Sequence, residues 1–572
     1  MIRKSSLHTS LFWVTAALTA LALIPFLGET LFYSKGEPRE AIVAYTMLES
    51  GNWTLPLNYG TDIAYKPPFL YWCIASCATL LGGMSEFASR LPSALAFLAM
   101  QLLFFRFVVR YRPAETAFLT SLLLLTSFEV HRAAVACRVD MVQVCFMVSA
   151  LCLLFRWDER GCRRLPWMAI LLMGCATLTK GPVGSFLPCL VIGVYQLLRG
   201  RGFFRTFFSL AGIGLLTFVP YALWMLAAWH QGGESFIDLM LEENTGRLTG
   251  KMSYESHENP VWYNFLTLIW GWVPWTLVLL LSLLVRRSSR VGEKCALSRR
   301  LRAWWQQFRG QSPFRLLCWL AIILIVGFYC IPKSKRSVYL LPVYPFMAVL
   351  MADYLLALVS RGARLLRGIA YLFAALGLLL TLTFVAVRLG WVPESLFSHG
   401  RHAADNLALF HALRDDVLPW WKVALTLLPV AGGILLLRLQ KSRRLEAYLP
   451  MQIGGMMLTL FVVLDGIYQP LVLSTKSERP LARQIEQMQP TGAIYSFSKM
   501  SYYGVNYYLG DRMRHIEQVR PEGEGLLLVS DKEEAAMLES LSPCYELQKV
   551  HHTATRSCDM RSPINIYKFQ RR

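Results

Sequence analysis

The sequence has few charged residues for its length: only 17% of its 572 residues are Asp, Glu, Lys or Arg. A soluble protein of ordinary composition has about 25%. Hydrophobic residues make up 55% of the chain, and apolar runs of about 20 residues, long enough to cross a bilayer, recur along most of it. The composition therefore excludes a set of soluble domains. It predicts one large helical membrane unit with a smaller part appended.

The sequence also lacks a basic stripe, a CxxC pair and an internal repeat. Its net charge of +21 comes from short clusters of Lys and Arg between apolar runs, so we expect no nucleic-acid partner. The 13 cysteines lie mostly inside apolar runs, where they act as small buried hydrophobes. Only Cys544 and Cys558 lie in the polar tail. Whether they form a disulfide is a question that the sequence leaves open.

Hydropathy predicts 13 membrane spans, of which the first is a retained helix and not a signal peptide. The predicted spans cover residues 11–33, 88–109, 115–131, 141–157, 165–180, 183–198, 206–229, 261–285, 315–332, 338–358, 369–390, 420–438 and 448–466. The basic clusters fall on alternate loops, on the side of Arg3 and Lys4. Because basic loops stay in the cytoplasm, the C-terminus is predicted to lie outside.

The predicted fold is an all-α membrane protein with a small C-terminal α/β domain. Residues 1–468 form the membrane unit, and its first outer loop, 34–87, is expected to carry interfacial helices over 38–50 and 67–83. Residues 469–572 are more polar. Short apolar runs at 493–497, 525–530 and 564–569 predict strands there, and 531–541 predicts a helix.

Ionisable residues gather at the outer ends of the predicted spans, where charge is costly unless it is paired or functional. They are Glu37, Arg39, Glu40, Lys66, Arg138, Asp140, Lys180, Glu243, Arg247, His257, Glu258, Lys333, Lys335 and Arg336. Several cations suit an anionic phosphate at the bilayer surface, and a carboxylate suits a general base. The set predicts group transfer from a phosphate-linked lipid.

Other interpretations of these groups stay open. Four cations would also serve as interfacial anchors: Lys180, Lys333, Lys335 and Arg336. Glu37 and Asp140 would also serve as charges that complement a helix dipole. A transporter or flippase of a lipid-linked sugar would place polar residues at the bilayer midplane, often in two related halves. Midplane charges are few and no repeat is visible, which favours an enzyme over a flippase. A non-catalytic assembly protein is the third alternative.

Several motifs occur in a fixed order along the chain. The loop after the first span reads GEPREAIVAYTMLESGNWTLPLNYG and then YKPPFLYW. Further motifs are CRVDM at 137–141, TLTKGPVG at 177–184, HENPVWY at 257–263 and YLLPVYP at 339–345. Together they resemble the GT-C class of lipid-to-acceptor glycosyltransferases, especially the bacterial aminoarabinose transferases that act on lipid A and the protein O-mannosyltransferases.

The resemblance implies an inverting transferase in the bacterial inner membrane, with its active site facing the periplasm. It would move a sugar, 4-amino-4-deoxy-L-arabinose or another pentose or hexose, from undecaprenyl phosphate to a lipid A, glycan or protein acceptor. Carried over by position, the catalytic candidates are Glu37, Arg39 and Asp140. The substrate-binding candidates are Lys66, Arg138, Lys180, Arg247, His257, Lys333, Lys335 and Tyr339.

Two departures matter for function when the chain is set against the family pattern, which reads Asp-Glu-x-Arg-Tyr-Ala and later Glu-Lys-Pro-Pro. Gly36 replaces the Asp, so Glu37 would act as base or orienting group alone or with Asp140. Tyr65 replaces the second Glu, which lies near a divalent-metal site in the family. His257 and Glu258 are the remaining metal candidates, and two ligands make a poor site. A divalent-metal cofactor therefore stays open.

Overall fold

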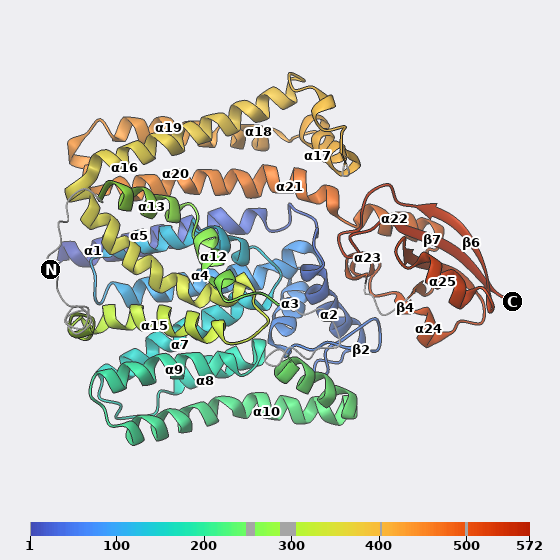
Figure 1. The fold of residues 1–572 in the computed structure, drawn as a ribbon, viewed down its shortest axis with the longest axis horizontal. Coiled ribbons are helices and arrows are strands. Elements are labelled where there is room, and N and C mark those ends of the chain that lie inside the picture. The colour runs from blue at the N-terminus through green and yellow to red at the C-terminus, as the bar shows by residue number, and fades with distance from the viewer. Residues whose placement is uncertain (1, 247–257, 287–304, 401–402, 498–501) are drawn as a thin grey trace.

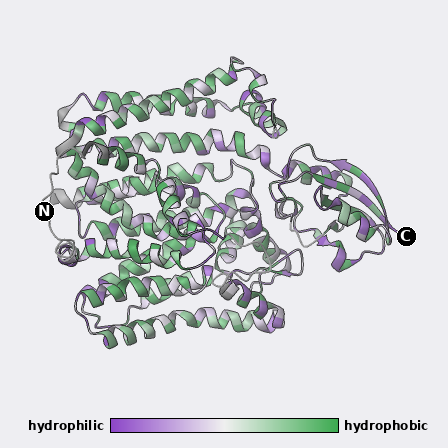
Figure 2. Ribbon diagram, in the orientation of Figure 1, coloured by the Kyte–Doolittle hydropathy of each residue, from purple (hydrophilic) through white to green (hydrophobic). Residues whose placement is uncertain are grey.

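Figure 1 shows, in a computed structural model, a helical bundle with a small sheet-containing unit at one end of its long axis. The structure describes residues 2–246, 258–286, 305–400, 403–497 and 502–572. The N-terminus lies at the end of the bundle opposite the sheet unit. Hydrophobic residues dominate the bundle helices, and hydrophilic residues are more frequent in the sheet unit and beside it (Figure 2).

Among the described residues, nine helices are long and apolar enough to cross a membrane, and one bent pair of helices would add a tenth. The long ones cover Leu7–Phe26, Glu86–Val108, Val139–Glu159, Phe203–Leu241, Pro313–Cys330, Ser337–Ser360, Ala363–Arg388, Trp420–Leu439 and Leu445–Lys476. The bent pair joins Trp262–Gly271 to Trp275–Leu283 at an angle of 101°. This confirms a multi-pass membrane protein.

The exact number of spans stays a prediction. Three of the 13 predicted spans coincide with helices of only 12, 14 and 16 residues, which are shorter than the roughly 20 residues that an upright span needs. The predicted span 115–131 is in fact two helices, because the first ends at Leu125 and the next begins at Phe128. The hydroxyls of Thr126 and Ser127 bond back to helix carbonyls at this break.

The bundle helices have the following bounds: α1 Ile2–Leu23, α4 Glu86–Val108, α5 Ala114–Leu125, α6 Phe128–Ala134, α7 Val139–Glu159, α8 Trp167–Lys180, α9 Val183–Leu198, α10 Phe203–Leu241, α12 Trp262–Gly271, α13 Trp275–Arg286, α15 Pro313–Cys330, α16 Tyr344–Arg388, α17 Ala403–Asp415, α18 Trp420–Thr426, α19 Leu428–Leu439, α20 Leu449–Val463 and α21 Gln469–Leu473. Short 3-10 helices include η3 at Ser337–Val343, and a π-helical turn, η6, covers Leu464–Tyr468. The largest hydrophobic core lies among α1, α4, α5, α7, α8, α9, α15, α16 and α20.

The first outer loop contains the two helices that the sequence predicts. Helix α2 spans Gly36–Ser50 and ends at Gly51, which has the left-handed conformation that glycine adopts easily. Helix α3 spans Phe69–Leu80 and starts directly after two prolines, which suit a helix start because they lack an N–H group. A two-stranded hairpin, β1 (Leu57–Asn58) and β2 (Asp62–Ile63), lies between them. Their depth relative to a bilayer stays a prediction.

The C-terminal unit is a five-stranded mixed sheet with short helices. Its elements are α22 Arg479–Met488, β3 Ile494–Ser496, α23 Tyr503–Tyr508, β4 Met513–His515, α24 Ile516–Val519, β5 Glu524–Ser530, α25 Glu534–Leu541, β6 Tyr545–His552 and β7 Ile564–Arg571. The strand order is β4-β3-β5-β7-β6, with β3 parallel to β4 and β5 and the other pairs antiparallel. The three predicted strands and the predicted helix are present, whereas β4 and β6 were not predicted.

Cys544 and Cys558 are both free thiols in the structure, so it does not contain the disulfide that the sequence left open. Cys544 is exposed, directly before β6. The Cys558 thiol instead lies beside the carboxylate of Asp559, at 3.7 Å from Oδ1. The two thiols therefore occupy different surroundings.

The C-terminal unit is attached to the first outer loop through Asp511. Its Oδ2 accepts a hydrogen bond from Thr46 of α2 at 2.7 Å, and its Oδ1 accepts one from the Tyr59 N–H at 3.0 Å. Nearby, the His515 ring stacks on Tyr59 and its Nε2 lies 3.0 Å from Asp62. Burial raises the pKa of Asp511. These contacts fix the outer loop from the side that faces away from the bundle.

We expect Asp511→Ala to loosen the C-terminal unit from the outer loop. It leaves buried donors unpaired, which costs on the order of 1–3 kcal/mol for each group. Thermal unfolding and limited proteolysis of the purified chain measure the effect. Asp405→Asn is the control, because Asp405 pairs with Arg556 on the exposed surface and such pairs contribute little. Unchanged unfolding and unchanged cleavage in Asp511→Ala would contradict the assignment.

Candidate functional site

An elongated cavity of about 900 Å³ opens beside the first outer loop. Its walls are almost entirely apolar and come mainly from α9 and α10, with Phe186, Leu190, Leu197, Phe203, Phe207, Leu210 and, from α15, Phe328 among the lining residues. One end is polar, and Lys66, Lys180, Glu243, Ser334 and Tyr339 line it. The cavity therefore joins an apolar channel to a cluster of charged groups.

Glu40 is the centre of one half of this charged cluster. Its Oε1 forms an ion pair with Lys66 and lies 3.1 Å from the Arg39 guanidinium, and its Oε2 accepts a hydrogen bond from Tyr71 at 3.0 Å. Burial would raise the pKa of Glu40, but Lys66 and Arg39 outweigh it and hold that pKa at about 2. Glu40 is therefore ionised at every physiological pH.

Lys66 carries a charge that burial disfavours. Burial lowers its pKa to about 8, because the attraction of Glu40 compensates only partly and Arg39 repels the ammonium group. The Lys66 and Arg39 cations also lie over the ring of Tyr65, at 5.6 and 5.3 Å from its centroid. Lys66, a predicted binding residue, thus lines the cavity. A second anion beside it, in addition to Glu40, would stabilise its charged form.

Asp140 and Lys180 form the other half of the cluster. Asp140 lies in the first turn of α7 and Lys180 ends α8, and the two side chains form an ion pair. The Lys180 Nζ also lies 4.5 Å from the centre of the Tyr339 ring, so three predicted residues meet at the cavity. The structure brings them together although they are far apart in the sequence.

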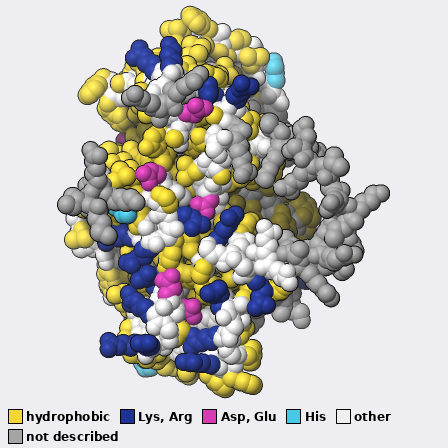
Figure 3. All heavy atoms as spheres, turned by 90° about the vertical axis from the view of Figure 1, so that its left-hand side faces the viewer, with side chains coloured by type: hydrophobic (Ala, Val, Ile, Leu, Met, Phe, Trp, Pro, Cys, Tyr) yellow, Lys and Arg dark blue, Asp and Glu magenta, His cyan; other side chains and the backbone are white. Residues whose placement is uncertain are grey.

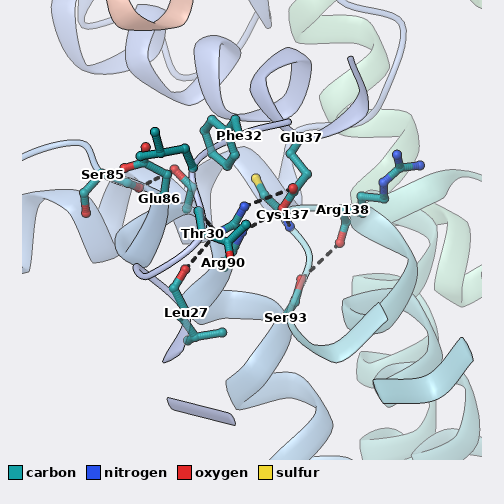
Figure 4. Close-up of polar contacts among 12 residues, drawn as sticks. Leu27, Thr30, Phe32, Glu37, Ser85, Glu86, Arg90, Ser93, Cys137 and Arg138 are labelled. Carbon is teal, nitrogen blue, oxygen red and sulfur yellow. Dashed lines mark hydrogen bonds and ion pairs between the residues drawn. The ribbon is translucent and has the colours of Figure 1, made fainter. Parts of the chain in front are cut away.

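Glu37 lies outside the cavity, in a buried pair with Arg90 of α4 (Figure 4). The Arg90 Nε and Nη2 donate to its two oxygens at 2.8 and 3.0 Å, and the Cys137 N–H donates at 2.9 Å. Burial would raise the pKa of Glu37, but Arg90 and this N–H lower it below its usual value. Of the two roles left open for Glu37, the geometry favours orientation over proton transfer.

Arg138 lies directly over Gly36, at the start of α2. A Cβ atom on Gly36 would lie 2.6 Å from the Cζ atom of Arg138, so the guanidinium occupies the space of a side chain at position 36. Figure 4 shows the Arg138 side chain directed away from the Glu37–Arg90 pair. Burial, and beyond it Arg39 and Arg138, lower the pKa of Arg336, against an opposing effect of Tyr339. Arg39, Arg138 and Arg336 thus lie close enough for their positive charges to repel one another.

The remaining predicted residues fall into two groups. Lys333 is exposed, and Lys335 is buried with its ammonium turned onto the carbonyls of Pro332 and Lys333. Neither lines the cavity, although Pro332 and Ser334 of the same loop do. Arg247 and His257 lie outside the described residues. Their assignment stays a prediction.

A metal site does not fit the described residues. They contain no group of three or more His, Cys, Asp or Glu side chains that could hold an ion. Glu258 forms a backbone bridge with Ser334, which brings the HENPVWY motif to the loop before η3. His257, the other predicted ligand, is not among the described residues. We therefore derive no step through a metal.

Two residues at the site received no role from the sequence. Glu40 was only one of several ionisable residues in its loop, and Arg90 fell inside a predicted span. A charge at the end of an apolar span is costly unless it is paired, and that rule could have indicated Arg90. Its partner could not be identified, because Glu37 is 53 residues away.

We expect Glu37→Gln and Arg90→Gln each to lower the free energy of unfolding by about 3–5 kcal/mol, because each leaves a buried charge without its partner. The double variant should lose about 1–3 kcal/mol less than the sum of the single losses. Denaturant titration of the purified protein measures all three.

The control for this pair is Asp353→Asn. Asp353 also forms a two-pronged pair, with Arg112 at 2.9 Å, but both side chains are about one-fifth exposed. Its loss should cost less than that of Glu37. Strict additivity of Glu37→Gln and Arg90→Gln would contradict a structural pair.

Known proteins resemble the chain in both sequence and fold. Residues 65–224 match the family model described as dolichyl-phosphate-mannose-protein mannosyltransferase. The undecaprenyl phosphate-alpha-4-amino-4-deoxy-L-arabinose arabinosyl transferase of Erwinia tasmaniensis is 26% identical over 73% of this chain and 70% of its own length. A transferase of the same description from Pseudomonas fluorescens is 31% identical, over 62% of this chain and 61% of its own length.

The fold extends further than the sequence match. The crystal structure of ArnT from Cupriavidus metallidurans bound to undecaprenyl phosphate matches with a TM-score of 0.69 at 20% identity, over 97% of both chains. The C-terminal sheet unit is therefore included in the shared fold. This chain has the GT-C fold and is related to the aminoarabinose transferases and the dolichyl-phosphate-mannose mannosyltransferase family, as its motifs predict.

Proposed function

We propose that this chain is a glycosyltransferase that takes a sugar from polyprenyl (undecaprenyl) phosphate and transfers it, with inversion, to a lipid A, glycan or protein acceptor. The observation that carries the proposal is the cavity, because it joins an apolar channel to Lys66 and Lys180. The relatives named for transfer from undecaprenyl phosphate bear out the predicted enzyme class and donor. 4-Amino-4-deoxy-L-arabinose is the sugar that their names favour.

The cavity suits the two parts of such a donor. A polyprenyl chain gains free energy by leaving water for an apolar channel, at roughly 25 cal/mol per Å² of buried surface. Its phosphate carries negative charge and would lie at the polar end, within reach of the ammonium groups of Lys66 and Lys180. Bulky lining residues such as Phe186 and Phe207 give the polyprenyl chain an apolar surface to contact.

In the proposed reaction the acceptor oxygen forms a bond to the anomeric carbon while the bond to the phosphate oxygen breaks. The electron pair of that bond stays on the departing phosphate, whose charge grows. Lys66 and Lys180 would stabilise this charge, which lowers the barrier where charge develops. We propose that Asp140 keeps Lys180, and Glu40 keeps Lys66, charged and in position. Arg39 would add a further positive charge beside Lys66.

The carboxylates near the cavity are poor bases in this state. Glu40 accepts from three donors and Asp140 is paired with Lys180. An acceptor whose reacting oxygen is already ionised, such as a phosphate, needs no base. Asp140 would be the base for a hydroxyl acceptor, provided that Lys180 moves onto the donor phosphate. The geometry thus favours an anionic acceptor.

We place the active site on the periplasmic face of the inner membrane. Figure 3 views the end of the bundle that carries the N-terminus, where Lys and Arg side chains are spread over the surface with few Asp and Glu. Basic loops there connect α4 to α5 and α7 to α8, and such loops stay in the cytoplasm. The first outer loop and the sheet unit lie at the other end (Figure 1). We propose residues 1–468 as the catalytic unit and 469–572 as a periplasmic domain.

The test of this proposal is transfer of labelled sugar by the purified full chain in lipid vesicles. Labelled sugar on undecaprenyl phosphate is supplied together with lipid A, envelope glycan or envelope protein, and label is followed into each. Transfer to one of them supports the proposal. Movement of the intact donor across the vesicle without cleavage would point to a flippase instead.

We expect Lys180→Gln and Asp140→Asn each to lower the transfer rate by about 10²- to 10³-fold, which is typical for loss of one group that stabilises developing charge. Lys476→Gln is the control, because Lys476 is exposed and is not among the residues that line the cavity. Its rate should stay within about twofold of the wild type. Near-normal rates in both cavity variants would contradict the assignment.

We expect the affinity for a polyprenyl phosphate analogue to fall as the pH rises above about 8, where Lys66 loses its proton. The bound phosphate would raise the pKa of Lys66, so the fall can reach tenfold per pH unit. Equilibrium binding of farnesyl phosphate between about pH 7 and 9.5, above the second pKa of a phosphate ester near 6, measures it. Lys66→Arg should bind independently of pH, because Arg stays charged. A flat wild-type profile would contradict the role of Lys66.

A further inference from the structure

Two residues that line the large cavity each have a buried polar atom without a hydrogen-bond partner among the residues that the structure describes. The atoms are the Nε2 of Gln143 and the hydroxyl oxygen of Thr206. Burying such a group without a partner costs free energy, so each one needs an explanation. In the wall of a binding cavity, such a group is a candidate contact for the ligand.

The two residues lie in different parts of the cavity. Thr206 is in the first turn of α10, and its methyl group lies 4.0 Å from the place of a Cβ atom on Gly193. Gly193 is ten residues along α9 from Val183, which corresponds to about 15 Å, so Thr206 lies among the apolar walls. Gln143 is on α7 instead, three residues after Asp140.

The spacing along α7 places Gln143 beside the charged cluster. Residues three apart lie on neighbouring positions of a helix surface, and Asp140 pairs with Lys180 at the polar end of the cavity. The next residue at this spacing is Phe146, whose ring packs against that of Phe69 with 5.2 Å between centroids. The α7 face thus changes from a carboxylate to an amide to an apolar ring. Gln143 lies at the boundary between the polar end and the apolar channel.

The amide of Gln143 suits a phosphate and not a prenyl chain. Its side chain is neutral and carries two N–H donors, and the residue is only 4% exposed. Rotation about the last side-chain bond turns these donors toward the cavity. A prenyl chain has no acceptor for them, whereas a phosphate ester has several oxygens. A hydrogen bond to such a charged group is about twice as strong as one between neutral groups.

We propose that Gln143 is a further donor-binding residue, which donates a hydrogen bond to the phosphate of polyprenyl phosphate from the side of the prenyl chain. The inference rests on the proposed function and deepens it, because this contact fixes how far the phosphate enters the channel. Lys66 and Lys180 attract the phosphate over a range of distances through their charge. A hydrogen bond from Gln143 forms only when a phosphate oxygen lies within about 3.2 Å. The lysines therefore supply attraction, and the amide supplies position.

The experiment compares equilibrium binding of farnesyl phosphate and of farnesol to the purified full chain in detergent. Gln143→Met and Gln143→Leu both lose the amide and keep a side chain of similar size. Farnesyl phosphate should bind to both variants about 10- to 100-fold more weakly than to the wild type, which is the range for a lost hydrogen bond to a charged group. Farnesol has the same chain without the phosphate, so its affinity should fall by no more than about twofold.

Thermal unfolding without ligand shows whether the variants keep the fold. Each removes a buried polar atom that has no partner in the described part of the chain, so each should unfold at the wild-type temperature or above it. Gln101→Met is the matched control. Gln101 is also a buried glutamine with one unpartnered amide atom, but it lies on α4 and does not line the cavity. This variant should bind farnesyl phosphate like the wild type.

Three results would overturn the inference: wild-type affinity for farnesyl phosphate in both Gln143 variants, an equal loss of farnesol binding, or an equal loss of farnesyl phosphate binding in Gln101→Met. Failure of the proposed function would look different, because the wild type itself would then not bind farnesyl phosphate, and both assignments would fall. Binding that depends on Lys180 and not on Gln143 would overturn this inference alone.

Discussion

The buried ion pair between Glu37 and Arg90 fixes the position of the first outer loop on the bundle. One guanidinium joins three segments, because it also donates to the carbonyls of Leu27 and Thr30 at the end of the first span. Glu37 also accepts a hydrogen bond from the Cys137 N–H, just before α7. Such a pair survives burial only when its remaining hydrogen bonds are made, and here the neighbouring backbone supplies them.

The position of Glu40 follows from this anchor. Residues three apart lie on neighbouring positions of a helix surface, so Glu37 holds α2 in a rotation that presents Glu40 to Lys66 and Tyr71. The second pair, Asp140 with Lys180, joins the ends of α7 and α8 at the same cavity. In both pairs the lysine lies next to an apolar channel, where water competes little with an incoming anion. A phosphate can then bind a lysine that stays paired with its carboxylate. Neither the lysine nor the carboxylate has to change its protonation state.

The sequence predicts the parts of the fold that depend on local pattern. Apolar runs locate the long helices, and the prolines at 67 and 68 locate the start of α3. The ordered motifs also predict that Lys66, Asp140, Lys180 and Tyr339 share one site. Strand β6 was missed because its sequence, YELQKVHH, is mostly polar and exposed at a sheet edge.

Partners across the fold could not be predicted in the same way. The family resemblance predicts Lys335 at the site, but the local turn directs its ammonium onto two carbonyls of its own loop. Glu37 has the spacing of a catalytic carboxylate, and only the packed structure reveals that Arg90 occupies it. The partners of Lys335 and Glu37 depend on which polar group comes within hydrogen-bond distance of each in the fold. Hydropathy and the order of motifs do not predict such distances.

The departures from the family pattern make physical sense when they are taken together. The pattern has Tyr where this chain has Glu40, and Glu where it has Tyr65. In the structure the Glu40 carboxylate pairs with Lys66, and the Tyr65 ring lies under Arg39 and Lys66. The acid and the phenol have thus exchanged positions, and Lys66 keeps a carboxylate beside it.

Gly36 is a different case, because no other carboxylate replaces the Asp of the pattern there. The guanidinium of Arg138 takes up the space instead, so the negative charge of the pattern is lost beside a cation. The exchange at positions 40 and 65 conserves the charge beside Lys66, whereas the change at position 36 makes the surroundings of Arg138 more positive. The two changes together therefore preserve the ion pair at Lys66 and remove a carboxylate only where the Arg138 guanidinium lies.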